Sequence, residues 1–242
     1  MRKLNTTDGE GDRIVRRKLS EQVLERLLDM ITRREIAPGE PMPSERDLMD
    51  RFGVGRPAVR EALQSLDTMG LISISHGERA RVSALTADTV IRQIDGVAQL
   101  LLSASPDNLE HLKQARRFFE TGMVRLAAAN AAPADIAELR NLVDRQRESL
   151  GDADAFIAAD IAFHRRIAAL SGNPIFAAIS GAMLNWLFNY HSEMLLWSGA
   201  EHKTLAEHAT IVDRLATGDG EGAATAMEGH LDRTDALYRH KD

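Results

Sequence analysis

Four side chains that could hold a metal ion lie in three segments of the C-terminal half of the chain. Asp160 and His164 are four residues apart in "DIAFHRRIAAL", so on a helix both project from one face. His208 lies in "EHATIVDRLA" and His230 in "AMEGHLDR", where apolar residues also recur with helical spacing. One carboxylate and three imidazoles that converge inside a helical bundle are a suitable ligand set for zinc and related divalent cations.

Each of these histidines has an alternative role as a hydrogen-bonded residue of the core. His208 is three to seven residues from Leu205, Val212 and Leu215, which places it on the inward face of its helix. A buried polar group without a partner costs several kcal/mol, and a bound metal removes that cost. The residues alone do not decide between a metal site and histidines that are hydrogen-bonded within the core.

The composition is that of a globular protein with one large or two smaller domains. The 242 residues are 44% hydrophobic and 27% charged, and cysteine is absent, which excludes disulfides and thiolate metal sites. No apolar run approaches the roughly 20 residues that span a bilayer, and the polar N-terminal residues lack the apolar centre of a secretory signal. We therefore expect a cytoplasmic protein.

The net charge of −6 conceals an asymmetry between the two parts of the chain. Residues 1–85 carry 15 basic and 14 acidic residues, whereas residues 86–242 carry 15 and 22. The first part also has a compact basic run, "RIVRRKL". Because DNA binding depends on one basic face and not on total charge, a nucleic-acid partner remains open.

The first part of the chain predicts a winged helix-turn-helix over residues 19–84, preceded by a flexible basic arm over residues 1–18. The expected elements are a helix at 19–34, a Pro/Gly loop at 36–43, a helix after Ser44, a turn at 53–55, a helix at 56–70 and a hairpin of strands 71–75 and 79–83.

Five residues of this domain are candidate DNA contacts. Arg56 and Arg60 lie one turn apart on the predicted recognition helix, and a guanidinium suits both guanine edges and phosphates. Arg46, early in the preceding helix, could bind a phosphate, and His76 and Gly77 at the hairpin tip could enter the minor groove. The alternative is a three-helix domain with a solvated arginine-rich surface.

After Ser83 the pattern is helical to the end of the chain. Residues 85–242 predict an all-α bundle of six or seven helices that binds ligand and metal and mediates dimerisation. The expected helices are 86–104, 108–131, 134–150, 152–171, 174–197, 200–217 and 220–240.

"PSERDL", "GVGRPAVREAL" and "L..MGLI" occur in that order between residues 19 and 83. They resemble the winged-helix signature of the GntR superfamily of bacterial transcription regulators. The resemblance implies that Arg46, Arg56, Arg60, His76 and Gly77 contact operator DNA.

The second part resembles the all-helical FCD effector domain of the FadR-like subgroup, through "D...H" and "EH..I...L..GD...A...M..HL". The resemblance implies that Asp160, His164, His208 and His230 bind a divalent metal, with zinc as first choice and nickel or manganese as alternatives.

The resemblance also implies an effector site. Arg116, four residues before Glu120 in "RRFFE", would face the pocket and bind a carboxylate; the alternative is a surface i,i+4 pair. Asn173 in "SGNP" caps the next helix or reaches the ligand. "HGERARVS" and "RFFETGMVRLAA" further resemble the sialic-acid-responsive branch of the family, which implies N-acetylneuraminate as the small carboxylate effector.

We thus expect a mainly α protein with a winged helix-turn-helix and an FCD-type bundle. We expect it to be a homodimeric repressor whose binding to double-stranded operator DNA responds to an organic acid. We expect neither enzymatic activity nor association with a membrane. Two alternatives are a metal-dependent enzyme acting on a sugar acid, and a regulator with a purely structural metal and another effector.

Overall fold

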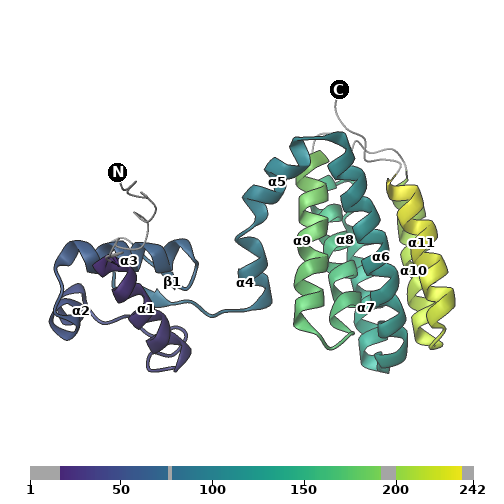
Figure 1. Cartoon of the computed structure of the whole chain (residues 1–242). Coiled ribbons are helices and arrows are strands. Elements are labelled where there is room, and N and C mark those ends of the chain that lie inside the picture. The colour runs from purple at the N-terminus through teal and green to yellow at the C-terminus, as the bar shows by residue number, and fades with distance from the viewer. Residues whose placement is uncertain (1–16, 76–77, 192–199, 236–242) are drawn as a thin grey trace, which may run out of the picture. The chain divides into compact units, whose positions relative to one another are not determined.

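The computed structural model describes residues 17–75, 78–191 and 200–235. It divides into two compact units, Met1–Leu85 and Thr86–Asp242, whose elements are labelled in Figure 1. Helices dominate both units, which confirms the predicted mainly α fold. Most of the predicted N-terminal arm lies outside the described residues.

Three helices form the first unit, and local sequence signals set their ends. They are α1 (Leu19–Thr32), α2 (Glu45–Phe52) and α3 (Arg56–Thr68). Ser44 caps α2 through a capping box with Asp47, and Gly53 ends it with a φ of 64°, a conformation that favours glycine. The inward faces of the three helices share one apolar core that includes Leu27, Leu48, Val59, Leu63 and Leu66.

The hairpin is present but shorter than predicted. β1 (Ile72–Ser73) pairs antiparallel with β2 (Arg81–Val82), and Pro41 forms an isolated bridge with Arg81. Ile72 and Val82 face each other in the core, whereas Ile74 is 47% exposed. Each of the two short strands therefore contributes one buried residue to the core. The predicted tip, His76 and Gly77, lies outside the described residues.

In the second unit, the single helix predicted over 86–104 was wrong. The chain forms α4 (Ala87–Arg92) and α5 (Asp95–Ser103), which are separated by a turn at residues 93–94. Asp95, at the start of α5, accepts a hydrogen bond from Trp186 Nε1 (2.6 Å), which lies far away in the sequence. The position of α5 thus involves a long-range contact that the periodicity of this segment does not indicate.

The remaining helices build the bundle, so the described part of this unit has eight helices and not the predicted six or seven. They are α6 (Pro106–Asn130), α7 (Pro133–Glu148), α8 (Ala153–Ala169), α9 (Pro174–His191), α10 (Glu201–Ala216) and α11 (Gly220–Asp235). Three of them begin with proline, which is suited to the first helical position.

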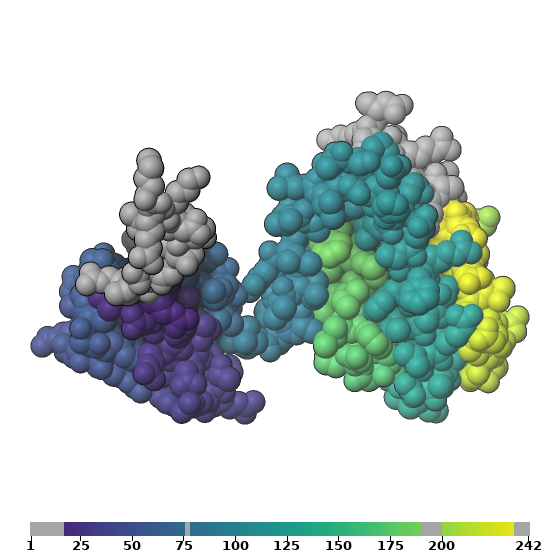
Figure 2. Space-filling model, in the orientation of Figure 1, coloured from purple at the N-terminus to yellow at the C-terminus, as the bar shows by residue number. Residues whose placement is uncertain are grey.

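The core of the bundle includes Val124, Leu139, Phe163, Val212 and Met227, all at most 1% exposed. α6 packs against α8, α9 and α11, and α10 packs against α7 and α11. Figures 1 and 2 show α6 (teal) between α9 (green) and α11 (yellow). Among the described residues, no helix is both long and apolar enough to cross a membrane.

Candidate metal centre and DNA-reading surface

The four predicted ligand residues lie together in the interior of the bundle. Asp160 and His164 project from α8, His208 from α10 and His230 from α11, and one ligand atom of each lies within 4.8 Å of the others. All four are buried, with exposures of 8% for Asp160 and at most 1% for the histidines. The spacing rules that predicted a shared face on α8 and an inward position for His208 therefore describe the structure correctly.

Three ligand-atom separations define the centre. His208 Nε2 is 3.4 Å from His230 Nε2 and 3.6 Å from Asp160 Oδ1, and His164 Nε2 is 3.8 Å from Asp160 Oδ2. Two ligands of a tetrahedral metal with bonds of about 2.1 Å are roughly 3.4 Å apart. The separations therefore match the size of a zinc site.

An acceptor faces the Nδ1 atom of each of the three imidazoles. A Glu120 carboxylate oxygen contacts Nδ1 of His164. Gln146 Oε1 is 2.8 Å from Nδ1 of His208, and Glu207 Oε2 is 2.9 Å from Nδ1 of His230. For His208 and His230 these contacts place the imidazole proton on Nδ1 and leave the Nε2 lone pair directed at the centre, and the Glu120 carboxylate favours the same arrangement in His164.

This arrangement fits a cation and is unfavourable without one. Two Nε2 lone pairs, those of His208 and His230, face each other at 3.4 Å, and the buried His164 Nε2 has no hydrogen-bond partner among the described residues. Leaving such atoms unsatisfied in the interior costs free energy. The nitrogen and carboxylate donors suit zinc, nickel or manganese.

Burial and neighbouring charges favour the protonation states that metal binding needs. Burial, followed by the neighbouring His230 and His164, lowers the pKa of His208 well below its usual value, and burial also lowers the pKa of His230. Both imidazoles are therefore neutral near pH 7.

The two carboxylates that face imidazoles stay ionised. Burial raises the pKa of Glu120, but the nearby His164 and Arg116 more than offset this effect, so its pKa lies well below the usual value. For Glu207, burial is likewise outweighed by hydrogen bonds to His230 and Arg233, and its pKa falls to about 2. Each carboxylate can therefore hold an imidazole proton on Nδ1.

Arg116 connects to the centre through Glu120. Its guanidinium is only 2% exposed, and Nε donates to Glu120 Oε1 at 2.6 Å. The other Glu120 oxygen contacts His164. The alternative of a surface i,i+4 pair was therefore wrong, because both partners are buried in the bundle.

Asn173 acts as a cap. Its Oδ1 accepts a hydrogen bond from the backbone nitrogen of Ile175 (3.0 Å) in the first turn of α9. Contact with an effector stays a prediction.

Gln146 and Glu207 were not predicted as partners of the ligands. Gln146 is fully buried, and it follows Leu139 and Val143 by seven and three residues, so it continues the inward face of α7. A polar residue among the apolar residues of an inward helix face indicates a buried polar partner, and the sequence contained this signal. Glu207 directly precedes His208, and no pattern in the sequence distinguished it.

The predicted DNA contacts that the structure describes lie on exposed parts of α2 and α3. The side chains of Arg56 and Arg60 are 60% and 61% exposed, and Arg46 is exposed on the first turn of α2. Arg60 Nε donates to Glu45 Oε1 at 2.8 Å, and Arg56 Nε lies 3.6 Å from Glu45 Oε2. Glu45 was not predicted as a partner of the two arginines.

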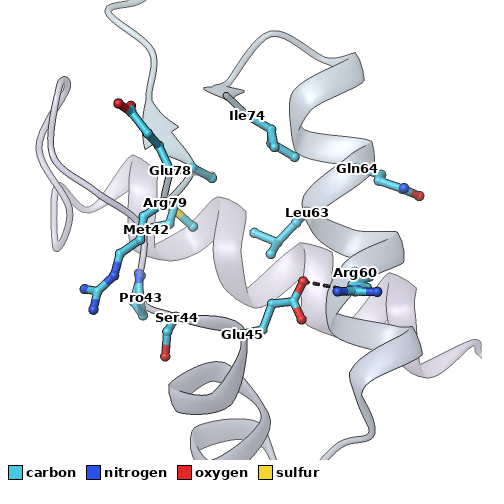
Figure 3. Close-up of a pocket in the computed structure, with 11 residues that line it drawn as sticks. Met42, Pro43, Ser44, Glu45, Arg60, Leu63, Gln64, Ile74, Glu78 and Arg79 are labelled. Atoms are coloured by element: carbon cyan, nitrogen blue, oxygen red, sulfur yellow. Dashed lines mark hydrogen bonds and ion pairs between the residues drawn. The ribbon is translucent and has the colours of Figure 1, made fainter. Parts of the chain in front are cut away.

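Beside the Glu45–Arg60 contact, the surface is hollowed between α2, α3 and the hairpin (Figure 3). The hollow has a volume of about 390 Å³, and its lining includes Leu63, Ile74 and Glu78. The terminal nitrogens of Arg60 make no hydrogen bond within the described part of the chain and remain available to a ligand.

Comparisons with known proteins identify both parts of the chain. Residues 19–82 match the family described as bacterial regulatory proteins, gntR family, and residues 111–233 match the FCD domain. The HTH-type transcriptional repressor NanR of Cronobacter sakazakii is 44% identical over 228 residues, which cover 93% of this chain and 87% of that protein. NanR of Escherichia coli K12 is 43% identical over 227 residues, which cover 93% and 86%.

Solved structures show the same fold at low identity. Streptococcus agalactiae GntR superposes with a TM-score of 0.62 at 22% identity, covering 90% of this chain and 99% of that chain. E. coli McbR/YncC has a TM-score of 0.52 at 20% identity, covering 92% and 98%.

Proposed function

The chain belongs to the GntR family of bacterial regulatory proteins and carries an FCD domain, and we propose that it is a homodimeric repressor controlled by a small organic acid. The supporting observation is that Asp160, His164, His208 and His230 converge in the FCD domain. Arg116 and Glu120 extend this buried polar cluster. The organic acid binds at this centre and changes the affinity of the winged helix for its operator.

Residues 19–84 read DNA. Arg56 and Arg60 enter the major groove on α3, and Arg46 contacts a phosphate near the start of α2. His76 and Gly77 reach the minor groove from the hairpin, and the basic arm over residues 1–18 adds charge. Two copies are needed because one winged helix reads only a half-site of a few base pairs.

Residues 85–242 bind metal and effector. Asp160, His164, His208 and His230 hold the cation, for which zinc is our first choice because their donors and separations suit it. When bound, the metal would supply a positive charge that attracts a carboxylate, and it would accept a carboxylate oxygen only by expanding its coordination beyond these four protein ligands.

The effector is a small carboxylate, and N-acetylneuraminate is our choice because relatives 43–44% identical carry the name NanR. Arg116 contributes a guanidinium that can bind the acid in bidentate fashion. Asn173 is the second candidate contact. An acid that binds one state of the protein more tightly than the other shifts the DNA-competent population by that difference in affinity.

The test combines metal analysis with ligand and DNA binding. Purified protein is assayed for bound metal, and its melting temperature is followed with N-acetylneuraminate before and after chelation. We expect a thermal shift that chelation abolishes, and a change in affinity for duplexes that the protein selects from a random library. A shift that survives chelation would contradict the role of the metal, and turnover of the acid would indicate an enzyme.

A further inference from the structure

Gln146 touches two of the candidate ligands at once, and they belong to different helices. Its Nε2 donates to Asp160 Oδ1 on α8 at 3.0 Å, and its Oε1 lies 2.8 Å from His208 Nδ1 on α10. The side chain is fully buried. We propose that Gln146 is a positioning residue that fixes the tautomer of His208 and the orientation of Asp160 before the metal binds. This inference rests on the proposed metal role of both ligands.

The two contacts determine which way the amide faces. An ionised carboxylate can only accept hydrogen bonds, so the amide nitrogen must face Asp160. The amide oxygen then faces His208 and requires a proton on Nδ1. The Nε2 atom of His208 consequently presents its lone pair to His230 and Asp160, where the cation binds.

The contrast with the other two imidazoles explains why a neutral amide occupies this position. His164 and His230 are held by the carboxylates of Glu120 and Glu207. A carboxylate in place of Gln146 would set a second negative oxygen about 3 Å from Asp160. An amide both donates to the aspartate and accepts from the histidine, so it satisfies two ligands without adding charge.

A second contact fixes the plane of the His208 ring, and Gln146 then fixes how the ring is oriented within that plane. Phe163 stacks on the ring with centroids 4.1 Å apart and an interplanar angle of 18°. Stacking fixes the plane of the ring but not which nitrogen faces the centre. The contact of Nδ1 with Gln146 Oε1 favours the ring orientation and the tautomer in which the Nε2 lone pair faces the centre.

The main test uses Gln146→Met, which keeps the size of the side chain and removes both strong hydrogen bonds. Zinc affinity of the full chain is measured by competition with a chelator, and the geometry of the site is followed by the absorption bands of bound Co²⁺. Loss of a residue that orients metal ligands typically lowers affinity 10–100-fold, and we expect a decrease in this range with altered Co²⁺ bands.

Val143→Ala is the matched control. Val143 is buried on α7, three residues before Gln146, and its aliphatic side chain has no polar atom that could orient a metal ligand. It should lower the melting temperature of the metal-free and zinc-loaded forms alike, with unchanged zinc affinity and Co²⁺ bands. Equal zinc affinity in Gln146→Met and Val143→Ala would overturn the proposal.

A measurement without metal separates this proposal from the proposed function. Histidine labelled with ¹⁵N reports the tautomer of each ring by NMR, and metal-free wild type should show His208 protonated on Nδ1. Gln146→Glu keeps an acceptor and should keep this tautomer, whereas Gln146→Met should lose it. Protonation of His208 on Nε2 in wild type would overturn the positioning role, whereas failure of wild type to bind zinc would overturn only the metal role.

Discussion

Replacing Glu45 with glutamine should weaken sequence discrimination more than DNA binding. Glu45 is the shared partner of Arg56 and Arg60, with Nε to carboxylate-oxygen distances of 3.6 and 2.8 Å. Both contacts use Nε and leave the terminal nitrogens of Arg60 free for a base edge. Glu45 thus holds an exposed guanidinium in one orientation while it adds a negative charge to the surface of α2 and α3 that we propose contacts DNA.

The expected magnitudes follow from exposure and distance. The two arginine side chains are about 60% exposed, and surface ion pairs contribute about 0–1 kcal/mol each, so folding should change little. Repulsion between a carboxylate and a phosphate about 8 Å apart costs roughly 0.5 kcal/mol of binding free energy in water. Glu45→Gln removes this repulsion, so affinity for random DNA should rise about twofold. A well-oriented arginine–guanine pair gives about 1–3 kcal/mol of discrimination; losing about 1 kcal/mol of it lowers the specificity ratio roughly fivefold.

The assay is fluorescence anisotropy at two salt concentrations, with one duplex selected by the wild-type protein and one scrambled duplex. Glu35→Gln is the matched control, because it removes the same charge from an exposed pair with Arg51 (3.1 Å) that does not involve α3. An unchanged ratio of specific to random affinity in Glu45→Gln, equal to that of Glu35→Gln, would refute the orienting role of Glu45.

Three further predictions concern single groups. Arg60→Ala should abolish preference for the selected duplex with little change in melting temperature, because its side chain is 61% exposed; undiminished affinity in a gel shift would contradict the recognition-helix assignment. Because burial lowers the pKa of His208 and His230, the unfolded chain binds more protons below about pH 6.5, so metal-free stability should fall as the pH drops from 6.5 toward the folded pKa values. Denaturant titrations across pH check this, and a pH-independent stability would contradict buried neutral histidines. Arg116→Lys should retain zinc but lose the thermal shift with N-acetylneuraminate, since a lysine cannot bind a carboxylate in bidentate fashion; an unchanged shift would remove Arg116 from the effector site.

Local sequence signals predicted the elements well. Ser44 and Gly53 marked the ends of α2, and α9 begins at Pro174 as predicted, whereas α6 and α7 begin at Pro106 and Pro133, slightly before the predicted starts at 108 and 134. Helical spacing also placed Asp160, His164 and His208 on inward faces, because the direction of a side chain follows from its position along a helix. These features depend on neighbours in sequence.

Features that depend on distant partners were missed or wrong. Asp95, which begins α5 just after the break from α4, is bound by Trp186, 91 residues further along the chain. Gln146 reaches two ligands 14 and 62 residues away, and Glu45 is 15 residues from Arg60. Helical periodicity shows that a residue faces inward, but it does not show which residue of another helix it meets.

The most direct test of the metal centre is X-ray absorption at the zinc edge on the full chain. We predict nitrogen and oxygen ligands at about 2.0–2.1 Å, with scattering from three imidazoles. His208→Ala and His230→Ala should each remove one imidazole or abolish binding. A zinc ion whose imidazole scattering is unchanged in both variants would contradict a centre built by Asp160, His164, His208 and His230.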